Sequence, residues 1–90
     1  MSTAARPNNS DPRVGSVEVT DELITAHLTD GRTISVPLAW SWRLSEASAE
    51  ARRHYVVIGD GEGIHWPDID EDISARGMLD GVPAHRPVRS

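Results

Sequence analysis

Alternating apolar and polar positions mark the first third of the chain. Apolar side chains fall at every second position at the end of 14–19, through 23–28 and through 33–36. That period is typical of strands that bury one face. Pro37 has no N–H to offer a neighbouring strand and should end the third of these segments. The pattern therefore predicts three short strands before residue 38.

The connector between the second and third segments decides their register. A two-residue Asp-Gly turn would set apolar Ile34 opposite His27 and would mix the two faces. A three-residue loop over 29–31 instead sets Ile34 opposite Ala26, which keeps the apolar face continuous. We therefore predict the three-residue loop, with Gly31 in the left-handed conformation of a bulge.

Helical and extended signals follow each other in the middle of the chain. Ser45 is a suitable N-cap for a helix over 46–53, because an acidic residue lies in its first turn and two arginines lie in its last turn. Residues 54–58 are apolar on both faces, which is typical of a central strand. We therefore predict one helix followed by the middle strand of the sheet.

The last part of the pattern consists of a glycine-rich turn, a strand and a second helix. Three glycines turn the chain within 59–63, and 64–66 continues as a short strand. A helix over roughly 70–80 should end at Gly81, where glycine favours a left-handed C-cap. The sum of these elements is an α+β fold, a small antiparallel sheet of four to five strands with two short helices.

The ends of the chain differ in composition from its middle. Residues 1–12 are rich in Ser, Asn, Pro and Ala without any period, and 83–90 hold two prolines and few side chains that could pack. We predict that both ends are disordered tails around a single domain at 13–82. A domain of this size buries only roughly 60% of its unfolded surface, so its core must be small.

Composition excludes several functional classes. The 90 residues include no cysteine and no lysine, which excludes disulfides, thiolate metal sites, Schiff bases and a phosphate-binding lysine. The net charge of −5 argues against direct binding of duplex DNA, which requires a basic face. No apolar run approaches the roughly 20 residues of a membrane span, and no hydrophobic signal peptide is present. We expect a cytoplasmic protein that does not bind membranes.

An acidic run is the main candidate for a working surface. Between His54 and Ala75 there are six carboxylates and no arginine, so one face should be strongly negative and suit a basic protein partner. Tryptophan is a frequent interface anchor; we expect Trp40 and Trp66 inside and Trp42 as the exposed anchor. The candidate partner-binding residues are Trp42, Asp60, Glu62, His65, Asp68, Asp70, Glu71 and Asp72.

The aspartates of this run have alternative roles. Asp68, Asp70 and Asp72 match positions 1, 3 and 5 of a calcium loop, but Ile73 stands where glycine is required and Leu79 where the loop needs a bidentate Glu. The calcium-loop interpretation fails, and we predict no metal and no cofactor, although a weak Mg²⁺ site on two of the carboxylates is chemically possible. A structural alternative is that Asp70 or Asp72 caps the second helix.

His65 is the candidate general base, oriented by Asp68 or Asp70. No cysteine, no Gly-x-Ser-x-Gly motif and no second histidine at ligand spacing accompanies it. Catalysis by a nucleophile requires a nucleophile, a base and an orienting group together. We therefore expect a non-enzymatic strand histidine that is held by a carboxylate or a backbone carbonyl.

Several short motifs resemble a known bacterial family. They are Asp-Gly-Arg at 30–32, Val-Pro-Leu-Ala-Trp at 36–40, Arg-Leu at 43–44, Arg53, Gly-Ile-His-Trp-Pro at 63–67 and Asp-Glu-Asp-Ile-Ser at 70–74. The chain is similar to the domain-of-unknown-function family numbered 2442. The resemblance implies a small α+β fold without established catalytic residues. It also implies genes paired with a second small protein in the manner of toxin–antitoxin modules, and some members fused to a helix-turn-helix.

Two departures from the family pattern affect these expectations. Ser41 and Trp42 stand where the family usually has an aromatic residue and a proline. No helix-turn-helix follows Gly81, so operator binding by this chain is not expected.

Three functional hypotheses follow. The first is a non-catalytic binding module, antitoxin-like or an adaptor, that engages a small basic protein encoded nearby. The second is an acidic inhibitor that imitates nucleic acid. The third is a small metal-assisted hydrolase, which would require His65, Asp68 and Asp72 to converge around an open coordination position.

Overall fold

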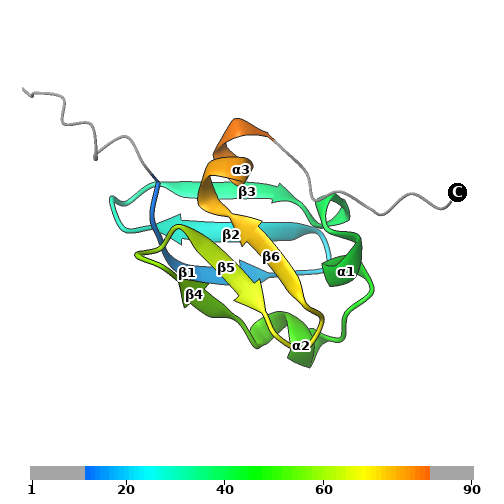
Figure 1. The fold of residues 1–90 in the computed structure, drawn as a ribbon. Helices are drawn as coiled ribbons and strands as arrows, with labels where there is room; N and C mark the ends of the chain where they lie inside the picture. The colour runs from blue at the N-terminus through cyan, green and yellow to red at the C-terminus, as the bar shows by residue number, and fades with distance from the viewer. Residues whose placement is uncertain (1–11, 82–90) are drawn as a thin grey trace, which may run out of the picture.

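The computed structural model describes residues 12–81 and places them in two three-stranded antiparallel sheets that enclose one core (Figure 1). The first sheet has the order β1 (Val14–Val19), β2 (Leu23–Leu28), β3 (Thr33–Pro37). The second sheet has the order β4 (Val56–Ile58), β5 (Gly63–Trp66), β6 (Glu71–Ser74). The predicted α+β class is confirmed, but the strands form two sheets instead of one sheet of four to five.

Short helices connect and follow the sheets. A 3₁₀ helix, η2 (Leu38–Trp40), and two α-helices, α1 (Trp42–Ser45) and α2 (Ala49–Arg53), lie between β3 and β4. The third α-helix, α3 (Ala75–Asp80), follows β6 and lies beside β3 and β6 (Figure 1). No helix among the described residues is long and apolar enough to cross a membrane.

The β2–β3 hairpin has the predicted register. Ala26 pairs with Ile34, and the N–H of Leu28 donates to the carbonyl of Arg32 at 2.8 Å. Gly31 has a φ of 97°, the left-handed conformation that the three-residue loop requires. In the same loop the backbone N–H of Arg32, together with its guanidinium, holds the pKa of Asp30 below its ordinary value.

The predicted helix over 46–53 is confirmed only at 49–53, and its predicted start is wrong. Ser41 caps α1 by accepting the N–H of Leu44, and Ser48 caps the separate helix α2 by accepting the N–H of Ala51. Ser45, the predicted cap, instead donates its hydroxyl to the carbonyl of Leu38 at 3.1 Å. A sequence with three serines in eight positions offers several caps, and tertiary packing selects among them.

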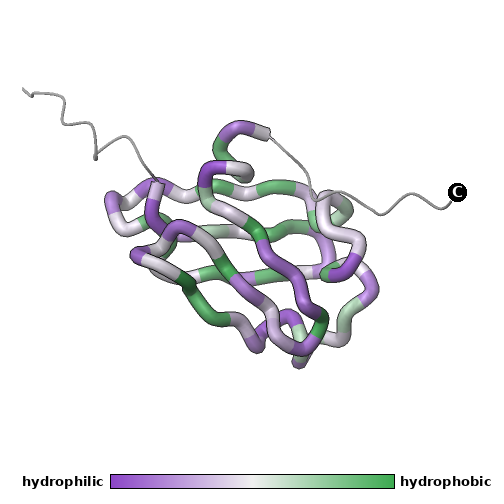
Figure 2. The backbone as a smooth tube through the Cα atoms, in the orientation of Figure 1, coloured by the Kyte–Doolittle hydropathy of each residue, from purple (hydrophilic) through white to green (hydrophobic). Residues whose placement is uncertain are grey.

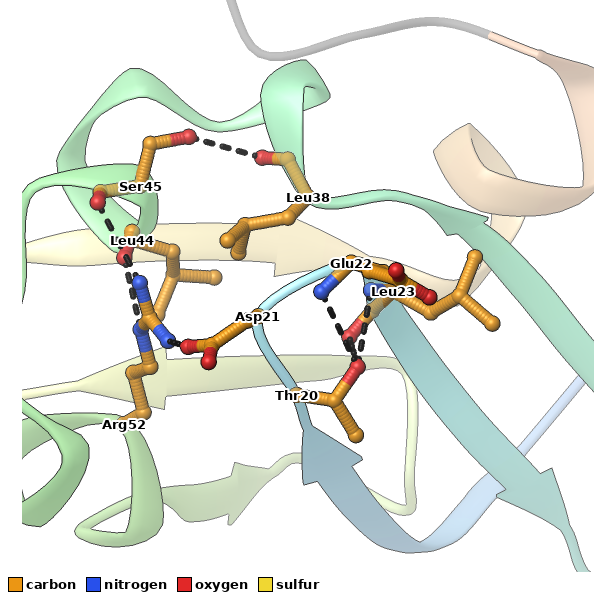
Figure 3. Close-up of polar contacts among 8 residues, drawn as sticks. All are labelled: Thr20, Asp21, Glu22, Leu23, Leu38, Leu44, Ser45 and Arg52. Atoms are coloured by element: carbon orange, nitrogen blue, oxygen red, sulfur yellow. Dashed lines mark hydrogen bonds and ion pairs between the residues drawn. The ribbon is translucent and has the colours of Figure 1, made fainter.

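Arg52 ties this helical connection to the turn between β1 and β2 (Figure 3). Its guanidinium donates to the carbonyl oxygens of Leu44 at 3.0 Å and Ser45 at 3.2 Å, and to Asp21 Oδ1 at 2.8 Å. Thr20 holds the turn itself, because its hydroxyl accepts the backbone N–H groups of Glu22 and Leu23. One arginine therefore fixes the helices against the first sheet.

The predicted central strand at 54–58 is an edge strand. β4 pairs only with β5, and its residues Val56 and Ile58 are 48% and 42% exposed. Its other side lies against β1, where the Tyr55 hydroxyl accepts the N–H of Val17 at 3.0 Å. The central strand of the second sheet is β5, because it pairs with both β4 and β6.

Trp66 is the largest side chain that is fully buried in the core. Its indole N–H donates to the carbonyl of Arg52 at 3.0 Å, and its ring lies 6.5 Å from that of Tyr55. The prediction that Trp66 lies inside is confirmed, while Trp40 is only partly buried and packs against the edge of the core. In a domain without phenylalanine, one tryptophan supplies much of the packing between the sheets.

The second predicted helix begins later than expected. Residues 71–74 form β6, and α3 starts at Ala75 behind Ser74, whose hydroxyl accepts the N–H of Gly77. Neither Asp70 nor Asp72 is the cap, so that prediction is wrong. The predicted end is confirmed, since Gly81 has a φ of 79°. Of the predicted tails at 1–12 and 83–90, the structure describes only Pro12, which is buried; Val82 of the predicted domain also lies outside the described residues.

Candidate functional site

The acidic run lies on and around the second sheet. Strand alternation directs Ile64 and Trp66 of β5 into the core, so Gly63 and His65 face outward. In β6 the same alternation places Asp72 outside. The outer face of the second sheet therefore carries polar groups from two neighbouring strands.

β4 adds apolar side chains to this surface. Val56 pairs with His65, and Ile58 pairs with Gly63, so both side chains lie on the outer side. Figure 2 shows β4 as an apolar stretch at the margin of the sheet. We define the outer face of the second sheet by six residues, which are Val56, Ile58, Gly63, His65, Asp72 and Ser74.

Two histidines on this side are held by aspartates. His65 Nδ1 lies 2.6 Å from Asp72 Oδ1, and His54 Nδ1 lies 3.1 Å from Asp68 Oδ2. The predicted strand histidine with a carboxylate partner is confirmed, but the partner is Asp72 instead of Asp68 or Asp70. Cross-strand pairing explains this choice, because β5 and β6 place His65 and Asp72 directly opposite each other.

The three groups that a hydrolytic metal site would need do not converge. Asp68 pairs with His54, away from the contact between His65 and Asp72. Among residues 12–81, no group of three His, Cys, Asp or Glu side chains is arranged to hold a metal ion. The geometry thus gives no support to the metal-assisted hydrolase.

A hollow of about 460 Å³ opens at one end of the outer face. Gly63 leaves room for it, because a Cβ at this position would lie 3.3 Å from the side chain of Ile58. The hollow brings two carboxylate residues together with two isoleucines. Its lining residues are Ile58, Gly59, Glu62, Gly63, Asp72, Ile73 and Ser74.

Glu71 is not a surface residue, which corrects the prediction of a partner contact. It is 4% exposed, and its carboxylate accepts the Ser41 hydroxyl at 2.5 Å and the N–H of Asp72 at 3.0 Å. The Arg43 guanidinium lies 3.7 Å from the same carboxylate. Glu71 therefore joins β6 to the start of α1 inside the protein. Sequence reasoning missed Ser41 as its partner, because 30 residues separate the two.

The remaining candidates are distributed unevenly. Asp60, Asp68 and Asp70 lie exposed in turns that flank β5, and Asp60 pairs with Arg13 at 3.5 Å. Trp42 begins α1, outside the second sheet, and is half-buried with the Arg43 guanidinium 4.9 Å from its ring centroid. The structure thus brings Glu62, His65 and Asp72 to one area and leaves Trp42 elsewhere.

The first sheet carries a carboxylate–imidazole–hydroxyl row that sequence reasoning missed. His27 Nε2 lies 3.1 Å from Glu18 Oε1, and His27 Nδ1 lies 3.4 Å from Thr33 Oγ1. The side chains of Glu18 and His27 are 64% and 46% exposed, so water solvates the row. Nucleophilic catalysis needs charge stabilisation in a sheltered site. We assign the row to cross-strand stabilisation.

Comparison with known proteins decides the family. The family model described as "Protein of unknown function (DUF2442)" matches residues 14–84. The chain belongs to the DUF2442 family. No curated protein matches it.

Two solved structures share the DUF2442 fold seen here. One is the crystal structure of a protein of unknown function from Rhodospirillum rubrum, with 25% identity and a TM-score of 0.72 over 83% of this chain and 93% of that chain. The other is the solution structure of the uncharacterized protein CV0863 from Chromobacterium violaceum, with 19% identity and a TM-score of 0.70 over 94% of this chain and 90% of that chain. These likenesses support the fold and say nothing of activity.

Proposed function

We propose that this DUF2442 protein is a non-catalytic binding module, antitoxin-like or an adaptor, that engages a basic protein in the cytoplasm. The observation that carries the proposal is the gathering of Glu62 and Asp72 on the outer side of the second sheet, flanked by Asp60, Asp68 and Asp70 in its turns. A surface of one charge attracts a partner of the opposite charge and accelerates its association.

The charge balance of the folded unit supports this proposal. Asp11 and three arginines lie outside residues 12–81, which leaves thirteen carboxylates against six arginines. Five of those arginines pair with, or lie within 4 Å of, a carboxylate of the chain itself. The excess negative charge is therefore available to an external partner.

The test is a pull-down of the tagged chain from native lysate, treated with nuclease. We expect one stoichiometric, nuclease-resistant basic protein. The variant with Asp68, Asp70 and Asp72 all changed to Asn should retain less of it and should lose part of the salt dependence of binding. Equal retention by both proteins at low salt would show that these carboxylates are not the contact.

The alternative is an acidic inhibitor that imitates nucleic acid, and the exposed carboxylates at both ends of β5 are the observation that favours it. Such a protein would occupy the nucleic-acid site of a basic enzyme. Competing duplex DNA would then release the captured partner, whereas a partner bound outside a nucleic-acid site would remain on the resin.

A further inference from the structure

The two outer faces of the protein differ in chemistry. On the first sheet, hydroxyls and charged groups satisfy one another: Thr25 Oγ1 lies 2.8 Å from Ser35 Oγ, and Glu18 pairs with His27. On the second sheet, Ile58 lines the hollow and Val56 lies on the same side of β4, and the two are 42% and 48% exposed. Exposed aliphatic side chains that adjoin a hollow and carboxylates indicate a contact surface.

The edges of the second sheet limit how a partner can approach. β4 is adjacent to β1 through the Tyr55 hydroxyl, which accepts the N–H of Val17. On β6, the N–H of Asp72 already donates to the Glu71 carboxylate at 3.0 Å. A strand added at either edge would need backbone N–H and carbonyl groups that are free to bond it. These contacts occupy part of each edge and favour an approach of the partner to the outer face.

The charge of the outer face determines which kind of partner can bind there. A second copy of this chain would bring Glu62 and Asp72 against the same carboxylates, and like charges brought together in an interface cost affinity. A segment with a guanidinium next to an aliphatic side chain matches both features of the surface. The guanidinium can bond a carboxylate through two N–H groups, and its methylene stem can lie on Ile58.

We propose that the outer face of the second sheet binds an extended basic protein segment that carries arginine and aliphatic side chains two positions apart, and therefore on the same side of the segment. The aliphatic side chains contact Val56 and Ile58, and an arginine enters the hollow between Glu62 and Asp72. This inference rests on the proposed function, because it specifies which chemistry of the basic partner is recognised and where.

The test uses the full chain and three synthetic peptides. They are Arg-Ser-Leu-Ser-Arg, Arg-Ser-Gly-Ser-Arg and Glu-Ser-Leu-Ser-Glu, each titrated at low salt into the ¹⁵N-labelled protein. We expect the first peptide alone to saturate, with amide shift changes at Ile58, Gly63 and Asp72. The Ile58→Thr variant should weaken this binding about tenfold, which corresponds to about 1.4 kcal/mol.

Leu23→Thr is the matched control. Leu23 is as exposed as Ile58, at 42%, but lies on β2 and faces outward from the first sheet. Its substitution should leave peptide affinity unchanged. An equal loss of affinity in both variants would overturn the proposal, because the effect would then not belong to the second sheet.

The remaining outcomes separate this inference from the proposed function. Equal affinity for the glycine peptide would overturn the aliphatic contact and leave an acidic partner-binding face. Equal affinity for the glutamate peptide would overturn the role of the carboxylates. If no peptide binds while the pull-down still captures a basic protein that depends on the aspartates, the inference falls and the proposed function stands.

Discussion

The buried carboxylate of Glu71 shows how one residue can hold two elements together. It receives the Ser41 hydroxyl and the N–H of Asp72, and it lies 3.7 Å from Arg43. Ser41 itself accepts the N–H of Leu44 and so caps α1. A buried carboxylate is tolerated here because donors surround it. Glu71 therefore stabilises the fold, although Asp70 and Asp72 on either side of it in the sequence are exposed at the surface.

Replacing Glu71 with Ala should be strongly destabilising. The Ser41 hydroxyl and the N–H of Asp72 would both remain buried or partly buried without their acceptor, so the free energy of unfolding should fall by about 2–4 kcal/mol. Glu71→Gln keeps an acceptor oxygen and should cost less. Urea unfolding followed by tryptophan fluorescence measures both effects.

Glu22→Ala is the control for this experiment. Glu22 is exposed in the turn after β1, and its removal should change the free energy of unfolding by less than about 0.5 kcal/mol. A Glu71→Ala protein as stable as this control would mean that Glu71 does not hold β6 to α1.

At the scale of elements, the turn between β5 and β6 depends on one unusual residue. Asp70 has a φ of 54° and is the non-glycine residue with positive φ in the described chain. Aspartate tolerates the left-handed conformation better than most residues, and glycine adopts it freely. Because a left-handed residue does not lie inside an α-helix, this conformation also excludes Asp70 from the predicted helix.

Substitutions at Asp70 should follow backbone preference. Asp70→Gly should leave the free energy of unfolding unchanged or raise it by up to about 1 kcal/mol, and Asp70→Val should lower it by about 1–2 kcal/mol. Asp70→Asn removes the charge alone and serves as the control. Chemical denaturation distinguishes the three variants, and full tolerance of valine would refute the argument from conformation.

Elements with local signals were predictable, and those set by distant contacts were not. The β2–β3 hairpin could be derived because its loop and its alternation agree on one register. The segment 71–74 could not, because its strand state arises from pairing with β5 and overrides a helix-like run of acidic residues. The same limit applies to the site: the acidic run was visible, but the burial of Glu71 depends on Ser41, 30 positions away.

The exposure of β4 illustrates this limit for function. An apolar run on both faces predicts a central strand, and the structure places it at an edge with Val56 and Ile58 outside. The local sequence pattern of a strand buried on both faces is the same as that of an edge strand whose apolar outer side is exposed. The mismatch between expectation and position is therefore itself the signal that points to the outer face of the second sheet.

At the scale of the whole molecule, the acidic surface should oppose folding. Residues 12–81 contain thirteen carboxylates and six arginines. Neither Glu62 nor Asp70 forms an ion pair in that part of the chain. Excess like charge destabilises a compact state through repulsion, and salt screens that repulsion. A surface that costs stability is expected where binding requires it.

The variant with Asp68, Asp70 and Asp72 changed to Asn should consequently be more stable than the unchanged chain and should bind less of the partner. Asparagine can still bond the two histidines and accepts the left-handed turn, so the change removes mainly charge. In low salt its melting temperature should rise by about 2–4 °C, equivalent to about 0.5 kcal/mol, and in high salt the gain should vanish. Calorimetry at the two salt concentrations provides the measurement. A lower melting temperature in both would instead assign these aspartates to the support of turns and strands, and would remove the stability argument for a binding surface.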